Sequence, residues 1–217
     1  LSTSRTPDRS APTGRSRLGR AITVAAVGAA ALTAGAILRA RRRIDLDGRV
    51  ALITGGSRGL GFLLAREFAD QGCRIVICAR DGEQLRHARE RLEDRGAEVL
   101  AVICDVGDPE QVEAMVEEAR RRFGRVDIVV NNAGIIQVGP IETMTREDFR
   151  EIMDTVFGGT LHTSLAVLPA MLERGEGRIV NITSIGARVA VPHLIPYDAA
   201  KFAQRGLSEG LAAELDR

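Results

Sequence analysis

From about residue 46 onward, short apolar runs alternate with longer segments in which apolar residues recur at helical spacing. The short runs are rich in β-branched residues and show little polar–apolar alternation, which is typical of strands buried on both faces of a sheet. This order predicts an α/β fold with a doubly wound parallel sheet. Five strands are predicted, at Arg49–Ile53, Arg74–Ala79, Val99–Cys104, Val126–Val130 and Arg178–Thr183. Five helices are predicted, near Phe62 to Ala69, at Gln84–Arg95, from the N-cap Asp108 to Phe123, from Thr145 to about Leu172, and at Tyr197–Leu215.

A glycine-rich loop follows the first predicted strand and leads directly into a helix, between Gly55 and Gly61. Glycines let the backbone turn tightly and approach a pyrophosphate, and the helix N-terminus offers free N–H groups. Asn131 and Ser184 follow or end other strands, so they fall at the same carboxyl edge of the sheet, where ligands bind. The pattern predicts a dinucleotide site, and the alternative is an ordinary glycine-rich turn.

The chain has one tyrosine and one lysine, Tyr197 and Lys201, and they stand four residues apart. On a helix this spacing places both side chains on one face. An ammonium there can lower the pKa of a phenol from its unperturbed value near 10. Such a phenol can exchange a proton with a carbonyl or an alcohol near neutral pH. The alternative is a surface tyrosine and a surface lysine on an amphipathic helix.

Three motifs together make the chain resemble the short-chain dehydrogenase/reductase family over about residues 46 to 217. They are T-G-x-x-x-G-x-G from Thr54 to Gly61, N-N-A-G at residues 131–134, and Y-x-x-x-K from Tyr197 to Lys201. The resemblance implies a Rossmann fold and an NAD(P)-dependent oxidoreductase that interconverts a carbonyl and a secondary alcohol by hydride transfer. It implies Tyr197 as the general acid/base and Lys201 as the group that lowers its pKa and holds the nicotinamide ribose. It further implies that Ser184 hydrogen-bonds the substrate oxygen, while a serine that satisfies a strand-to-loop backbone group is the alternative.

The resemblance also implies a set of cofactor-binding residues, with Asp105 and Val106 beside the adenine. The set is Thr54, Gly55, Ser57, Arg58, Gly59, Gly61, Arg80, Asp105, Val106, Asn131, Ala133, Gly134, Tyr197 and Lys201. NAD enzymes place an acid near the end of the second strand, where this chain has Ala79. Arg80 and Arg58 suit a 2′-phosphate instead, which arginine binds bidentately. NADP(H) is therefore the preferred cofactor, and NAD(H) is the alternative if Asp81 bonds the ribose rather than capping a helix.

The sequence departs from the family pattern at two places. The family carries an asparagine inside the long fourth helix, where it supports a proton path to the lysine, and alignment places Val156 there. Valine cannot form a hydrogen bond through its side chain. The chain also ends at Arg217, within the last predicted helix, so the fold is expected to be truncated at its C-terminus. The alternative function is therefore a catalytically impaired, membrane-tethered nucleotide-binding protein or fragment.

The first 43 residues differ from the rest in composition. Residues 1–20 form a basic tail, and residues 21–43 form an apolar segment, uncharged from Ala21 to Leu38, that ends in an arginine collar. Eighteen uncharged residues reach the lower length limit for a membrane span. We expect a membrane anchor, with a secretory signal or an organellar transit peptide as alternatives. The domain, residues 44–217, is expected in the cytoplasm, where NADPH is supplied.

The charge distribution and the apolar residues indicate which kinds of partner the protein is expected to bind. Residues 1–43 hold nine arginines and one acid, so they carry +8 and the remainder carries −7, because the whole chain carries +1. A domain of this charge is not expected to bind nucleic acid. The apolar residues at 135–138 and 189–195 predict a small lipophilic carbonyl or alcohol substrate. A full-length chain is expected to form a homo-oligomer.

The sequence offers no metal-type spacing of cysteine and histidine, so no metal site is predicted. The three cysteines, Cys73, Cys78 and Cys104, lie in or beside predicted strands and are interpreted as core residues.

Overall fold

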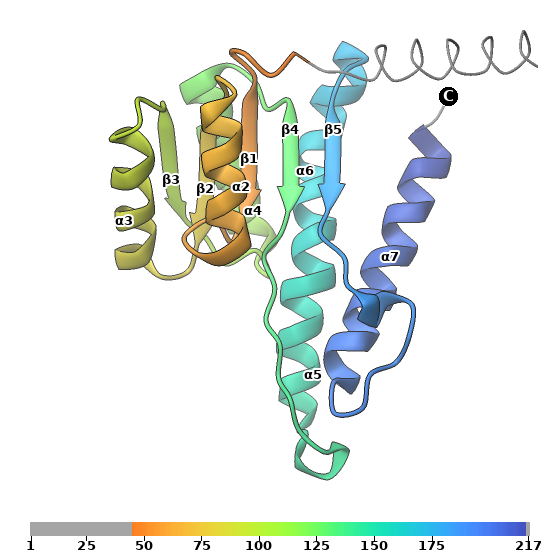
Figure 1. The fold of residues 1–217 in the computed structure, drawn as a ribbon. Coiled ribbons are helices and arrows are strands. Elements are labelled where there is room, and N and C mark those ends of the chain that lie inside the picture. Colours follow the sequence, from red (N-terminus) through yellow and green to blue (C-terminus); the bar gives the residue numbers. More distant parts are fainter. Residues whose placement is uncertain (1–44, 216–217) are drawn as a thin grey trace, which may run out of the picture. The chain divides into compact units, whose positions relative to one another are not determined.

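A computed structural model describes residues 45–215, and the elements below belong to the unit Leu46–Arg217. Five parallel strands form one sheet in the order β3-β2-β1-β4-β5 (Figure 1). The strands are β1 (Val50–Thr54), β2 (Arg74–Ala79), β3 (Val99–Ile103), β4 (Ile128–Asn131) and β5 (Arg178–Asn181). The α-helices are α2 (Gly59–Asp70), α3 (Gly82–Glu93), α4 (Pro109–Phe123), α5 (Arg146–Met153), α6 (Gly159–Arg174) and α7 (Ile195–Leu215). Shorter helical turns are η1 (Ile141–Thr143), η2 (Asp154–Gly158) and η3 (Ile185–Ala187).

Both faces of the sheet are buried against helices, as the near-continuous apolar strands predict. Alternate residues of β1 point to opposite faces. Val50 and Leu52 pack in a core with apolar residues of α4 and α6. Ala51 and Ile53 pack in a second core with residues of α2 and α3. The predicted doubly wound α/β fold is therefore confirmed.

Several predicted boundaries move by a few residues, each for a local reason. The fifth strand ends at Asn181 rather than Thr183, because Asn181 pairs with Asn131, the last residue of β4. The third strand ends at Ile103, one residue before the predicted end, and Cys104 begins the turn. The last helix begins at Ile195, two residues earlier than predicted, with Pro196 in its first turn, where a missing N–H costs nothing.

The predicted helix from Thr145 to Leu172 contains a π-helical turn that the sequence did not indicate. Thr145 is the N-cap of α5 and forms a capping box with Asp148. Five residues, Asp154–Gly158, then have π-helical geometry before α6 continues to Arg174. A π turn is an irregularity that often accompanies a functional site, and this one contains Val156.

Only one helical stretch within residues 45–215, Arg146–Arg174, is long and apolar enough to cross a membrane by those criteria alone. Half of its most apolar window is buried inside the domain. It therefore has the character of a core helix. The proposed anchor, residues 21–38, lies outside the described residues.

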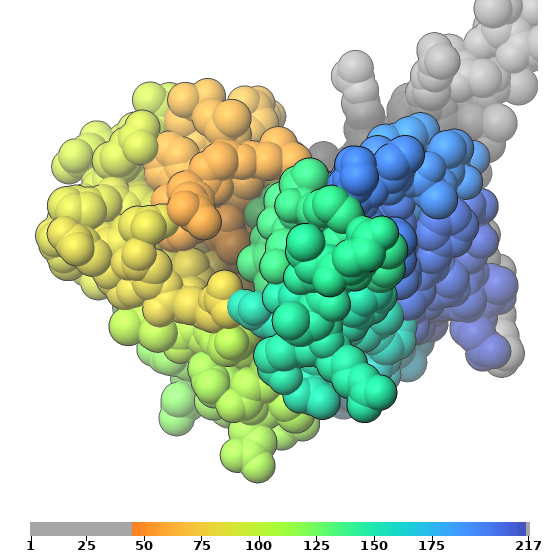
Figure 2. Space-filling model, turned by 90° about the horizontal axis from the view of Figure 1, so that it is seen from below, coloured from red at the N-terminus to blue at the C-terminus, as the bar shows by residue number. Residues whose placement is uncertain are grey.

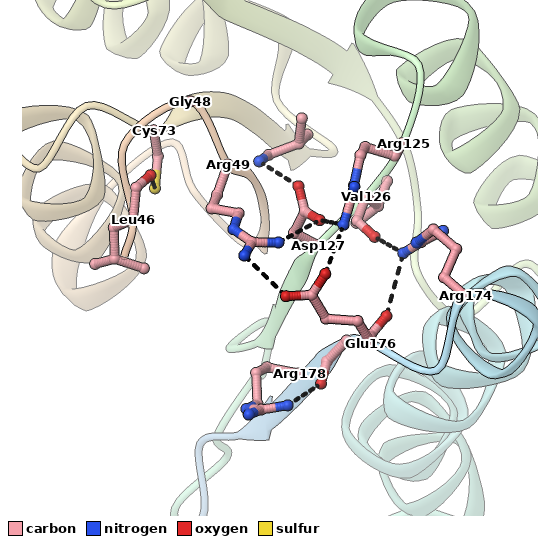
Figure 3. Close-up of polar contacts among 12 residues, drawn as sticks. Leu46, Gly48, Arg49, Cys73, Arg125, Val126, Asp127, Arg174, Glu176 and Arg178 are labelled. Carbon is pink, nitrogen blue, oxygen red and sulfur yellow. Dashed lines mark hydrogen bonds and ion pairs between the residues drawn. The ribbon is translucent and has the colours of Figure 1, made fainter. Parts of the chain in front are cut away.

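Four charged side chains meet at the amino ends of β1, β4 and β5, on the edge opposite the strand carboxyl ends (Figure 3). Asp127 is 5% exposed and accepts a hydrogen bond from the Val50 backbone N–H at 2.9 Å. Arg125 contacts Asp127 and lies 3.3 Å from Glu176. Arg49 lies 2.8 Å from Glu176 and 3.5 Å from Asp127. These four side chains, the amino-edge ion cluster, link the central strands to the loop before β5.

Candidate active site

A cavity of about 440 Å³ opens at the carboxyl edge of the sheet. Its walls come from the loop after β1, the end of β2, the turn after β3 and the loop after β4. Figure 2 looks onto this edge, where the orange segment around the glycine loop and the green segment after β4 face each other. Ten residues of the predicted cofactor set line the cavity: Gly55, Ser57, Arg58, Gly59, Gly61, Arg80, Asp105, Val106, Ala133 and Gly134.

The glycine loop needs glycine for two different reasons. Gly55 and Gly59 have φ values of 65° and 56°, a region that side-chain-bearing residues rarely adopt. Gly61 packs directly against the Gly55 backbone. A Cβ at position 61 would stand 2.6 Å from Asn132 Nδ2 and closer still to the Gly55 carbonyl oxygen, so no larger residue fits there. The loop therefore leaves its backbone N–H groups close to the cavity at the start of α2, as phosphate binding requires.

Four residues of the predicted set do not line the cavity: Tyr197 and Lys201 on α7, which are described below, and Thr54 and Asn131. The Thr54 hydroxyl accepts hydrogen bonds from the backbone N–H groups of Asn132 and Ala133, both at 3.0 Å. Asn131 is 2% exposed and donates to Asn181 Oδ1 at 2.8 Å, toward the sheet interior. Both residues hold the loop after β4 in place.

Asn132, which the predicted set omits, lies in the cavity wall. Its side-chain amide donates to the Thr54 carbonyl at 2.9 Å, so it ties the loop after β4 to the glycine loop. The N-N-A-G motif contains it, and only the structure distinguishes its direction from that of Asn131. Successive strand residues point to opposite faces, so one asparagine faces the cavity and the other the core.

Asp81, at the end of β2, caps a helix. One carboxylate oxygen accepts from the backbone N–H groups of Glu83 and Gln84, both at 3.0 Å. The other oxygen accepts from the Gln84 side chain at 2.7 Å. Asp81 therefore acts as the N-cap of α3, the role that the sequence offered as the alternative to a ribose contact.

Two arginines, Arg80 and Arg58, border the end of the cavity at which Asp81 lies. Arg80 is half-exposed and lies 3.4 Å from Glu151 and 3.9 Å from Asp105. Arg58 is exposed and is the N-cap residue of α2. Exposed ion pairs are weak, so the contacts of Arg80 leave it available to a stronger anionic ligand.

Tyr197 and Lys201 lie on one face of α7, as predicted, with the lysine nitrogen 5.7 Å from the centre of the tyrosine ring. The tyrosine ring packs against the apolar group formed by Ile152, Val156 and Ala200. Lys201 is 4% exposed and donates to the Ile182 carbonyl at 2.7 Å. Burial lowers the pKa of Lys201 to about 8, so the lysine still carries its charge at neutral pH.

Ser184 is the N-cap of η3, and its hydroxyl oxygen accepts from the Gly186 backbone N–H at 3.1 Å. Its O–H therefore remains available as a donor. The loop that carries Ser184 is fastened to α7 by Asp198, which is 5% exposed and accepts from the Val191 N–H at 2.6 Å. Asp198 was not singled out from the sequence, since only the folded loop gives it a partner.

Val156 is fully buried in the π turn η2 and contacts the apolar side of the tyrosine–lysine pair. The second hydrogen bond of Lys201 goes to Gln204 Oε1 at 2.9 Å. Gln204 stands one helical turn after Lys201, a spacing that could have identified it.

All three cysteines are buried and unpaired. Burial raises the pKa of Cys73 to about 11, which is typical of an inert core thiol. Cys78 and Cys104 are adjacent and line the cavity wall. Within residues 45–215 no group of three or more histidine, cysteine or acidic side chains is placed to hold a metal ion.

Comparison with known proteins identifies the same region. The family model described as short chain dehydrogenase matches residues 49–217. The chain is 37% identical over 173 residues to gluconate 5-dehydrogenase of Gluconobacter oxydans, covering 80% of this chain and 68% of that protein. The alignments span 62 to 68% of the length of the first curated relatives, about two thirds of each.

Two solved structures agree with this match. One is a gluconate 5-dehydrogenase from Burkholderia cenocepacia in complex with NADP and tartrate, at a TM-score of 0.74 and 38% identity, covering 79% of this chain and 67% of that one. The other is a short chain dehydrogenase/reductase from Burkholderia phymatum in complex with NAD, at a TM-score of 0.77 and 31% identity, covering 79% and 62%. With its parallel sheet, glycine loop and tyrosine–lysine helix, the chain belongs to the short-chain dehydrogenase/reductase family of oxidoreductases.

Proposed function

We propose that the protein is an NADP(H)-dependent oxidoreductase that interconverts a carbonyl and a secondary alcohol. The observation that carries this proposal is the pair on α7: a half-buried phenol whose ring stands 5.7 Å from the ammonium of a buried lysine. This pair is combined with a glycine-lined cavity at the carboxyl edge of the same sheet. Membership of an oxidoreductase family supports the same chemistry.

Each residue then has a role in reduction of a carbonyl. Tyr197 Oη donates a proton to the substrate oxygen, and Lys201 stabilises the negative charge that this leaves on the phenol. The Ser184 O–H donates a hydrogen bond to the same substrate oxygen, since its oxygen already accepts from Gly186. A nicotinamide cofactor, when bound, supplies or accepts the hydride. Oxidation of the alcohol reverses these proton movements.

The residues present fit a dinucleotide. Gly55 and Gly59 have the positive φ that the turn of the loop requires, and the loop lines the cavity at the start of α2. The Asp81 carboxylate accepts three hydrogen bonds from the first residues of α3, which favours its role as a helix cap over that of a ribose ligand. Arg58 and Arg80 border that end of the cavity. These features favour NADP(H), and relatives with NADP and with NAD are both known.

Replacing Arg58 and Arg80 by alanine should weaken NADPH binding by roughly 10- to 100-fold, because a hydrogen bond to a charged group contributes about 1.5–3 kcal/mol. NADH binding should change little, since NADH lacks the 2′-phosphate. Fluorescence titration with both cofactors measures the effect. Arg86→Ala, which removes an exposed arginine on α3 paired with Glu90, is the matched control. Equal losses for both cofactors would show that these arginines do not select the phosphate.

The substrate is proposed to be lipophilic. Two loops expose apolar side chains: Ile136 and Val138 after β4, and Val189 before α7, are each more than half exposed. The loop after β4 reaches the tyrosine through Ile135, which packs in the same apolar group. The Gly139 N–H donates to the His193 carbonyl at 3.0 Å, which joins the two loops. Apolar walls with a few polar groups are typical of small-molecule pockets.

A ketone series of rising chain length tests the reaction and the substrate class together. NADPH oxidation followed by absorbance should appear with simple ketones, and kcat/KM should rise about three- to fourfold for each buried methylene, which contributes about 0.8 kcal/mol. A preference for short polar ketones would contradict the lipophilic pocket. Absence of NADPH oxidation with every carbonyl tried would contradict the proposed reaction.

A further inference from the structure

A chain of hydrogen bonds leads from the catalytic lysine into helix α6. Lys201 Nζ donates to Gln204 Oε1 at 2.9 Å, and Gln204 Nε2 donates to Thr160 Oγ1 at 2.7 Å. Thr160 Oγ1 in turn donates to the Val156 carbonyl at 2.8 Å. The chain connects α7 to the first turn of α6 and to the π turn before it.

Gln204 has no exposed surface, although glutamine is mostly found at protein surfaces. Burying an amide costs free energy unless its polar atoms are hydrogen-bonded. Here both ends of the amide have a partner, Lys201 on one side and Thr160 on the other. A buried amide that is bonded at both ends fixes the groups that it touches.

The direction of these bonds fixes the orientation of the amide. The Thr160 hydroxyl has a single proton, and it is used on the Val156 carbonyl. Thr160 Oγ1 can therefore only accept from Gln204, so the NH₂ group of Gln204 faces Thr160. The amide oxygen must then face Lys201, where it accepts from the ammonium.

Apart from Gln204, the described surroundings of Lys201 provide few hydrogen-bond acceptors for its ammonium group. Val156 and Ala200 form an apolar contact beside the pair, and the Ile182 carbonyl is the other acceptor with a described hydrogen bond to the lysine. On α7 itself, the aromatic ring of Tyr197 lies beside the Lys201 ammonium, and the Asp198 carboxylate accepts a hydrogen bond from the Val191 N–H. Burial alone lowers the pKa of Lys201, and no charged group contributes to the shift, whether on α7 itself or on α5, α6, η2 and η3, which contact α7.

We propose that Gln204 is a positioning residue for Lys201: its amide, oriented by Thr160, fixes the ammonium beside Tyr197. This inference rests on the proposed function only for the role of the lysine in catalysis. An amide held in this way does not pass a proton on, because its NH₂ group points away from the lysine. Any proton that leaves Lys201 must therefore leave by a contact other than Gln204.

Lys201 is the only lysine in the chain, so its side chain can be observed directly. Protein labelled with ¹³C at the lysine Cε gives one lysine signal, and its titration measures the pKa without assignment or substrate. In the unaltered protein the midpoint should lie at about 8. An unfolded lysine would titrate near its ordinary value of about 10.4 instead, which makes loss of structure recognisable.

Two substitutions at position 204 should move this midpoint in opposite directions. Gln204→Leu removes an acceptor that favours the charged form, so the lysine pKa should fall by about one unit, a tenfold change in the dissociation constant. Gln204→Glu places a carboxylate at the same distance from the ammonium, so the lysine pKa should rise by about one unit or more. A merely structural role would not produce opposite shifts. If Gln204→Leu fails to fold, an unchanged lysine pKa in a folded Gln204→Glu variant would still overturn the proposal.

A matched pair of threonines on α6 tests the orientation by Thr160. Thr160→Val frees the amide to rotate and should lower the lysine pKa by a smaller amount. Thr163→Val is the control, because Thr163 is also buried and makes the same kind of bond, to the Gly159 carbonyl at 2.8 Å, away from Gln204. A folded Gln204→Leu variant with an unchanged lysine pKa, or an equal shift in Thr163→Val, would overturn the proposal.

Kinetics separate this proposal from the proposed function. If the protein reduces ketones, the alkaline limb of kcat/KM should move down in Gln204→Leu and up in Gln204→Glu, following the lysine. If no carbonyl is reduced but the NMR midpoints move as expected, the proposed reaction fails and the positioning of Lys201 by Gln204 is supported. Turnover with an unchanged lysine pKa in both Gln204 variants would overturn the positioning alone.

Discussion

Tyr197→Phe should lower kcat by at least about 100-fold while leaving NADPH affinity unchanged. General acid–base catalysis contributes about 10²–10⁴-fold, and this substitution deletes only the oxygen that would transfer the proton. The ring itself packs against Ile152, Val156 and Ala200, and phenylalanine keeps that packing. Steady-state kinetics with the best ketone, together with cofactor titration, measures both quantities. A variant that retains more than about one hundredth of the rate would rule out Tyr197 as the general acid.

Two further variants on α7 sharpen this result. Lys201→Ala should lower both turnover and cofactor affinity, since the lysine is proposed both to stabilise the phenolate and to hold the nicotinamide ribose. Phe202→Leu is the control, because Phe202 is an aromatic residue on the same helix that is 44% exposed. Its turnover should match that of the unaltered protein. Loss of activity in this control would point to damage of the helix rather than to loss of the phenol oxygen.

Asp127→Ala should lower the free energy of unfolding by about 3 kcal/mol, the lower end for a buried ion pair broken on one side. The lower end applies because Arg49 and Arg125 remain partly exposed, at 27% and 35%. The substitution also removes the acceptor of the Val50 backbone N–H, at the first residue of β1. Urea denaturation of the purified protein measures the change.

Asp70→Ala is the matched control for the amino-edge ion cluster. Asp70 pairs with Arg95 through bonds of 2.8 and 2.9 Å, but the pair is exposed. An exposed pair contributes about 0–1 kcal/mol. If Asp127→Ala destabilises the protein no more than Asp70→Ala, the cluster does not stabilise the junction of β1, β4 and β5. Asp127→Asn should have an intermediate effect, since its side-chain oxygen can still accept from Val50.

The fold was predictable because local patterns agree with the global one. Uninterrupted apolar strands, helical spacing between them and helix caps such as Asp108 all favour one α/β domain. The π turn was not predictable, since the sequence Asp154–Gly158 has the same apolar periodicity as an ordinary helix. The sheet order also required the structure, because sequence order alone does not decide which strands pair.

For the site, the sequence by itself determined what depends on local geometry. The turn after β1 depends on positive φ at Gly55, which a glycine in the sequence indicates directly. The contact between Tyr197 and Lys201 depends on the i,i+4 spacing of a helix, which the sequence also shows. The tertiary structure decided what depends on contacts between distant segments. It turned Asn131 to the core and Asn132 to the cavity, committed Asp81 to a helix cap, and joined Lys201 through Gln204 to Thr160, 44 residues away from Gln204. Such partners are chosen by packing between helices, and no local pattern encodes them.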